Sequence, residues 1–127
     1  MDLHHEGIVY LVDDDEAVRD SMRELLRSYG VDVRDYGSAR EFLEEPFRDR
    51  TSCLLLDLHM PGMSGLELLE LLHERGDPIP VIVITGRSDT FLRERVHEAG
   101  AMALLNKPVD DEELVQSIET ALGATRH

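Results

Sequence analysis

The 127-residue sequence has little of three things: cysteine, lysine and long apolar runs. Its single cysteine, Cys53, cannot form a disulfide within the chain or build a cysteine-based zinc site, and it suits a reducing compartment. Apolar runs extend over only a few residues, so no segment is long enough to cross a membrane. We therefore expect a cytoplasmic protein that does not associate with a membrane.

Basic residues are scarce as well: 13 lysines and arginines face 27 acidic residues, and the formal net charge is −14. Affinity for DNA comes largely from neutralising phosphates with basic side chains. We therefore expect no direct nucleic acid binding by this chain, whereas cation binding and regulation of a DNA-binding partner stay open. Lys107 is the only lysine in a chain that otherwise uses arginine.

A chain of this length suits one domain. We expect its core over about residues 7–122 and a tail, or the start of a linker, over 123–127. Five short apolar segments predict strands over 8–12, 31–36, 52–57, 81–85 and 103–105. Helical periodicity covers 18–29, 38–43, 66–72, 90–99 and about 110–122, and Ser38 with Glu41 has the capping-box pattern.

This strict alternation predicts an α/β fold with a doubly wound parallel sheet of five strands and helices on both faces. Three strands are almost continuously apolar, which is typical of strands buried on both faces of a parallel sheet. The second strand is more polar, so we expect it at an edge of the sheet.

The carboxyl ends of parallel strands meet at one rim of the sheet, where ligands bind. Four of the predicted strands are closed by polar residues at this rim: Asp13 and Asp14, Asp57, Thr85, and Lys107. Each of these residues, taken alone, more often has a structural than a functional role. The neighbouring Asp15 has the position of an N-terminal helix cap. Their convergence nevertheless predicts a single site.

The chemistry of this set is specific. Carboxylates held together repel each other, and a hard divalent cation such as Mg²⁺ relieves the repulsion. We expect Asp57, alone at the end of the most central strand, to be a nucleophile that forms an aspartyl phosphate. Asp13 and Asp14 are then cation ligands, while the Thr85 hydroxyl and the Lys107 ammonium can contact phosphoryl oxygens.

The ordered motifs resemble the receiver domain of bacterial two-component response regulators, over about residues 7–122. They are Val12-Asp13-Asp14-Asp15, then Leu56-Asp57-Leu58-His59-Met60-Pro61-Gly62-Met63-Ser64-Gly65, then Ile84-Thr85-Gly86, and Lys107-Pro108. The segment after Asp57 is most similar to the nitrogen-fixation regulator subfamily, whose full-length members carry a helix-turn-helix output domain. The resemblance implies the flavodoxin-like strand order 2-1-3-4-5 and a non-enzymatic signalling role.

The resemblance also implies the roles of the residues at the rim. Asp57 would accept phosphate from a histidine kinase. Asp14 and Asp57 would bind Mg²⁺ through their side chains, His59 through its backbone carbonyl and Asp13 through water. Lys107 would pair with the phosphoryl group, and the Lys107–Pro108 bond would be cis.

Leu104 departs from the family pattern, which usually has an aromatic residue three positions before the lysine. On activation Thr85 would move toward the phosphate, and the surface of the fourth helix, fifth strand and fifth helix would be remodelled. With leucine in place of the aromatic, we expect Thr85 and the fourth helix to carry this change. We also expect phosphorylation to promote a homodimer through that surface, and a separate DNA-binding domain to regulate transcription.

Two other classes of protein compete with this interpretation. A small haloacid-dehalogenase-like phosphatase also uses an aspartyl phosphate, and Asp13-X-Asp15 superficially matches its first motif. On that interpretation Asp57 has no role. The acidic pair that these phosphatases have later in their sequence is also absent from this one. A receiver-like interaction module that never takes phosphate should lack the aspartate, threonine or lysine, and all three are present.

Overall fold

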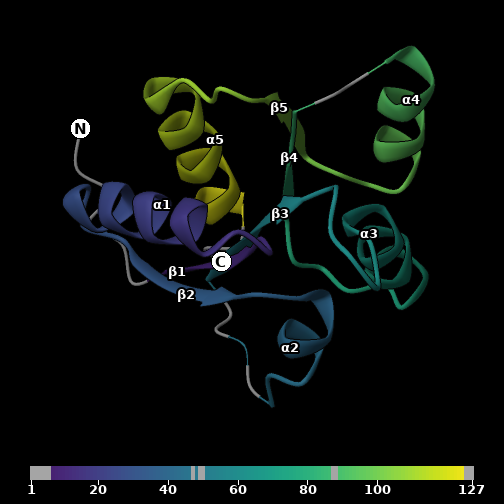
Figure 1. The fold of residues 1–127 in the computed structure, drawn as a ribbon, viewed down its shortest axis with the longest axis horizontal. Coiled ribbons are helices and arrows are strands. Elements are labelled where there is room, and N and C mark those ends of the chain that lie inside the picture. The colour runs from purple at the N-terminus through teal and green to yellow at the C-terminus, as the bar shows by residue number, and fades with distance from the viewer. Residues whose placement is uncertain (1–6, 47, 49–50, 87–88, 125–127) are drawn as a thin grey trace.

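The computed structural model describes residues 7–46, 48, 51–86 and 89–124. Five parallel strands form one sheet in the order β2-β1-β3-β4-β5, as expected (Figure 1). The strands are β1 (Ile8–Val12), β2 (Asp32–Tyr36), β3 (Ser52–Asp57), β4 (Val81–Thr85) and β5 (Ala103–Asn106). The helices are α1 (Glu16–Ser28), α2 (Ala39–Leu43), α3 (Gly65–Glu74), α4 (Thr90–Glu98) and α5 (Asp111–Ala124).

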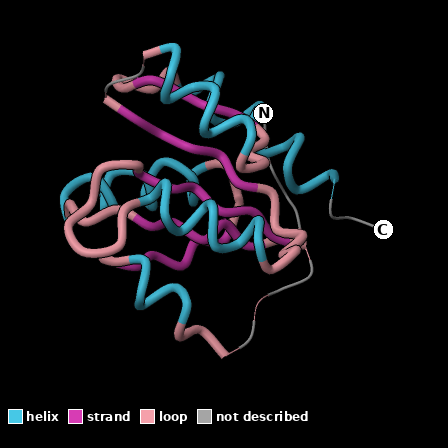
Figure 2. The backbone as a smooth tube through the Cα atoms, turned by 90° about the vertical axis from the view of Figure 1, so that its right-hand side faces the viewer, coloured by secondary structure: helices cyan, strands magenta, loops and turns pink. Residues whose placement is uncertain are grey.

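The sheet lies between two layers of helices. Helices α1 and α5 cover one face, and α2, α3 and α4 cover the other (Figure 1). Figure 2 shows the same layering from the side, with strands between helices. Each face of the sheet has its own apolar core. Alternate residues of a strand pack into one core or the other, because side chains along a strand point to opposite faces. In β1, for example, Val9 packs beneath α1 and α5, whereas Tyr10 packs on the other side.

Strand β2 is the polar edge strand that the sequence predicts, and it starts one residue later than expected. The reason is the end of α1, where Gly30 has a φ of 84° and the N–H of Val31 donates to the carbonyl of Leu26. Val31 is thus bonded to the helix end and is not yet paired in the sheet. A left-handed glycine at this position is the usual way to end a helix.

The helix caps agree with the local sequence, except that the full capping box forms at α3 and not at α2. Asp15 caps α1 as expected, since its carboxylate accepts the N–H groups of Ala17 and Val18. At α2, Ser38 accepts the N–H of Glu41, but its hydroxyl also contacts the Glu41 carboxylate, so the expected reciprocal capping box is incomplete. A full capping box forms instead at the start of α3, between Ser64 and Glu67.

Helix α5 begins behind Asp110, whose carboxylate accepts the N–H of Glu113. It continues through residues 123 and 124, which the sequence suggested as tail, and residues 125–127 lie outside the described part. Within the described residues, none of the helices has the length and apolar character needed to span a membrane.

Candidate functional site

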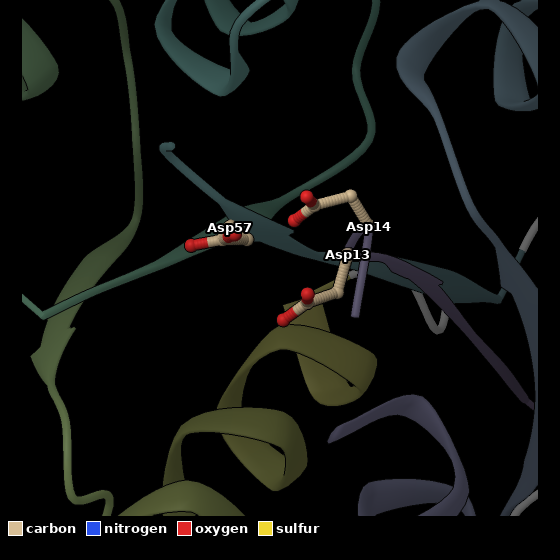
Figure 3. Close-up of side chains that lie close together, drawn as sticks. All are labelled: Asp13, Asp14 and Asp57. Atoms are coloured by element: carbon tan, nitrogen blue, oxygen red, sulfur yellow. The ribbon is translucent and has the colours of Figure 1, made fainter. Parts of the chain in front are cut away.

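Three carboxylates meet at the carboxyl end of the sheet. Asp57 is the last residue of β3, and Asp13 and Asp14 follow β1 directly; β1 and β3 are paired neighbours. Each of the three offers an oxygen, and these oxygens all lie within 4.8 Å of one another (Figure 3). Asp13 and Asp57 are buried, while Asp14 is exposed, so the cluster opens to solvent on one side.

The environment of Asp57 disfavours its charged form. Burial of the Asp57 carboxyl raises its pKa most, and the nearby negative charge of Asp13 raises this pKa further. The ammonium of Lys107 and a hydrogen bond from the backbone N–H of His59 act in the opposite direction, without cancelling the rise. A group that offsets the negative charge is therefore favoured at this position.

Lys107 provides one such positive charge. Its Nζ lies 3.6 Å from Oδ1 of Asp57 and 3.7 Å from Oδ2 of Asp13. The Lys107–Pro108 bond is cis, as expected, and the N–H of Lys107 donates to the carbonyl of Thr85 at 2.8 Å. The only lysine of the chain therefore points at the acidic cluster from the end of β5.

The remaining predicted residues surround this centre. Thr85 is completely buried at the end of β4. His59 lies two residues beyond Asp57 with its side chain exposed to solvent. Leu104 is half-buried and packs with the core beneath α3 and α4, and it lines a pocket of about 460 Å³ between α4 and β5. Leu104 is thus on the α4 side of the sheet and not among the carboxylates.

Sequence reasoning overlooked Arg19 as part of this neighbourhood. Its Nη1 donates to the backbone carbonyl of Asp13 at 2.7 Å, and its Nε donates to Asp35 at 3.0 Å. No sequence motif distinguishes Arg19 from the other arginines of α1, because both acceptors lie on other segments.

Gly65 is required by a close approach at this site. A Cβ on Gly65 would overlap the backbone carbonyl oxygen of Asp57 and lie 2.7 Å from the Cα of Leu58. We expect Gly65→Ala to lower the free energy of unfolding by about 2–3 kcal/mol, because backbone must move to accept the methyl group. Urea unfolding measures this, with Gly86→Ala as the control, since no atom of the described residues other than Gly86 and its chain neighbours lies within 4 Å of a Cβ there. Equal stability of both variants would contradict the close approach.

The raised pKa of Asp57 predicts a pH-dependent stability. The folded protein holds this proton more readily than the unfolded chain, so the free energy of unfolding falls as pH rises from about 4 through the raised pKa. Asp57→Asn removes this loss and should raise the free energy of unfolding at pH 7 without divalent cations. The gain should shrink near pH 4. Urea unfolding at both pH values measures this, and Asp32→Asn, at an exposed position, is the control. An Asp57→Asn variant with no higher free energy of unfolding at pH 7 would contradict the prediction.

Comparison with known proteins identifies the family. A model of the response regulator receiver domain matches residues 9–119. The chain belongs to this family. The receiver is 40% identical over 117 residues to response regulator protein TmoT of Ectopseudomonas mendocina, covering 92% of this chain and 53% of that protein. It is 41% identical over 115 residues to transcriptional regulatory protein FixJ of Azorhizobium caulinodans, covering 91% and 54%.

The solved structures agree with the fold of the receiver. The crystal structure of FixJ-N is similar at a TM-score of 0.85 and 38% identity, covering 94% of this chain and 95% of that one. The receiver spans about half the length of the curated relatives it matches. These similarities give no support to the phosphatase alternative.

Proposed function

We propose that Asp57 is the phosphoacceptor of this receiver and takes a phosphoryl group from a phosphohistidine of a histidine kinase. The observation that supports this most is the place of Asp57: it is buried at the end of β3, with the Lys107 ammonium 3.6 Å from one carboxylate oxygen. In the transfer, that carboxylate attacks phosphorus and an O–P bond forms. The N–P bond to the kinase histidine breaks, and its electron pair leaves with the imidazole.

The acidic cluster fits a magnesium ion. Its donors are carboxylate oxygens within 4.8 Å of one another, which are the hard ligands that Mg²⁺ prefers. We assign Asp14 and Asp57 as side-chain ligands, the His59 backbone carbonyl as a third ligand, and Asp13 as a ligand through water. Bound there, Mg²⁺ supplies positive charge that offsets the carboxylates and the incoming phosphoryl oxygens.

Lys107 and Thr85 act on the phosphorylated state in this proposal. Lys107 pairs with a phosphoryl oxygen, and the Thr85 hydroxyl moves to contact another. Because Leu104 lacks a polar tip, it repacks without exchanging a hydrogen bond, and α4 carries the change. Of the described residues of α4, Val96 alone is buried, so this helix is weakly anchored and a small bias can shift its position.

We expect phosphorylation to promote a symmetric homodimer through the surface of α4, β5 and α5. Sedimentation at tens of micromolar, with magnesium and with or without a beryllofluoride mimic, tests this. The expected result is a shift from monomer toward dimer with the mimic. An unchanged monomer, with unchanged hydrogen exchange in α4 and β5, means that the output uses another face.

We propose that this receiver takes part in the regulation of transcription in the bacterial cytoplasm. Relatives that extend beyond the matched region include a transcriptional regulatory protein. At a net charge of −14 the receiver itself is not expected to bind DNA, so a separate domain would do so. The receiver is not an enzyme with an external substrate; it supports only its own phosphorylation and dephosphorylation.

The test of this function is a time course with a small phosphodonor. Intact-mass spectrometry should show the mass of one phosphoryl group added per chain with Mg²⁺, and little addition when the metal is chelated. The phosphate should be acid-labile and decay slowly. Steady turnover of a phosphate ester without a stable phosphoprotein would instead favour the phosphatase, and no labelling at all would favour a module that never takes phosphate.

A further inference from the structure

Behind the acidic cluster, an arginine of α1 bridges two other segments. The Arg19 guanidinium donates through Nε to Oδ2 of Asp35 on β2 at 3.0 Å, and through Nη1 to the carbonyl oxygen of Asp13 at 2.7 Å. Only 17% of the Arg19 side chain and 24% of the Asp35 side chain are exposed. A half-buried bridge with a charged donor is stronger than a neutral hydrogen bond and less screened by solvent.

The bridge completes the fixation of Asp13. The N–H of Asp13 donates to the carbonyl of Tyr36 at 3.2 Å, and its Oδ1 accepts the N–H of Asp15 at 2.9 Å. The bond from Arg19 holds the remaining main-chain polar group of Asp13. This carbonyl belongs to the peptide that joins Asp13 to Asp14, so its orientation sets how both carboxylates face Asp57.

The guanidinium itself is held in place on two sides. Oδ1 of Asp35 also accepts a hydrogen bond from Arg23 at 2.9 Å, so the carboxylate that anchors Arg19 is fixed by a second arginine one turn later in α1. Gly37 lies against the guanidinium, and a Cβ there would sit 3.3 Å from Nη1 of Arg19. The absence of a side chain at Gly37 leaves room for the bridge.

We propose that Arg19 is a positioning residue for the cation site, which it serves by fixing the Asp13–Asp14 peptide against β2. The inference rests on the proposed binding of Mg²⁺ by the acidic cluster. Charge alone cannot explain the arrangement, because a fixed positive charge beside a cation site weakens cation binding. Geometry and charge therefore predict opposite results when Arg19 is removed.

The test is the affinity of Arg19→Ala for Mg²⁺, measured by titration followed in ¹H–¹⁵N NMR spectra. We expect binding to weaken about tenfold, at the lower end of the range for residues that support metal ligands. Affinity equal to or tighter than that of the unaltered protein would overturn the proposal, because loss of a positive charge alone gives that result. Urea unfolding of each variant shows whether it is folded under the titration conditions.

Two further variants sharpen the result. Arg27→Ala removes an exposed arginine of the same helix that takes no part in the bridge, and its Mg²⁺ affinity should stay within about twofold of the unaltered protein. Arg19→Lys keeps the charge but not the planar two-point donor, so its affinity should fall between those of the alanine variant and the unaltered protein. An Arg19→Lys variant that binds Mg²⁺ as tightly as the unaltered protein would contradict the role of the bridge. If Arg19→Ala does not fold, Arg19→Lys provides the test.

A spectroscopic signature separates positioning from general destabilisation. The amide ¹⁵N shift of Asp14 responds to the hydrogen bond on the Asp13 carbonyl, so it should change in Arg19→Ala without metal and stay unchanged in Arg27→Ala. If the unaltered protein itself does not bind Mg²⁺, the proposed cation site fails. If it binds and Arg19→Ala binds equally well, only the role of Arg19 fails.

Discussion

Asp57→Asn should abolish phosphorylation of the receiver by a small phosphodonor, with a loss of at least about 100-fold in the rate of labelling. An amide is a far weaker nucleophile than a carboxylate, and Asp57 is the buried carboxylate that Lys107 approaches at 3.6 Å. Intact-mass spectrometry of both proteins with excess phosphodonor and Mg²⁺ measures the loss.

Asp32→Asn is the matched control for this experiment. Asp32 is an exposed aspartate at the start of β2, on the opposite rim of the sheet from the acidic cluster. This variant should be labelled like the unaltered protein. Labelling of Asp57→Asn at another residue to the original extent would remove Asp57 from its assigned role.

The second large effect is expected at the single lysine. Lys107→Arg should reduce the population of the activated conformation at least about tenfold, although the charge is kept. The small ammonium of Lys107 lies close to both Asp57 and Asp13. We expect that a broader, planar guanidinium cannot take the same position between them. NMR shifts of residues in α4 and β5, recorded with the beryllofluoride mimic, report the change.

The affinity for Mg²⁺ separates this effect from damage to the metal site. Lysine is not assigned as a ligand, so Lys107→Arg should bind Mg²⁺ within about twofold of the unaltered protein. Arg40→Lys, a swap between the same two residue types at an exposed position of α2, controls for the change of side chain. A full response of Lys107→Arg to the mimic would show that the compact ammonium has no special role.

Most of the fold could be predicted from the sequence because local signals and burial agree. Apolar runs such as the one in β3 are buried along their whole length, and the polar character of β2 correctly indicates an edge. The misses are at boundaries. The start of β2 depends on a hydrogen bond from Val31 to the end of α1, and the capping at α2 depends on which atom the Glu41 carboxylate contacts. The residue types alone decide neither where β2 begins nor how α2 is capped.

The candidate site could be predicted because its residues close successive strands. Strand ends converge in any doubly wound sheet, so the grouping of Asp13, Asp57 and Lys107 follows once the strands are recognised. The contacts of Arg19 and the close approach at Gly65 were not predictable. Both depend on the distance between segments that meet only in the folded chain.

The central claim is that this receiver is phosphorylated at Asp57, and residue-level mapping tests it most directly. After treatment with a phosphodonor and Mg²⁺, borohydride converts an aspartyl phosphate to homoserine, which peptide mass spectrometry can locate. We predict homoserine at position 57 alone, and none when magnesium is chelated. Homoserine at position 13 or 14, or an unmodified residue 57 in a chain that carries phosphate, would contradict the claim.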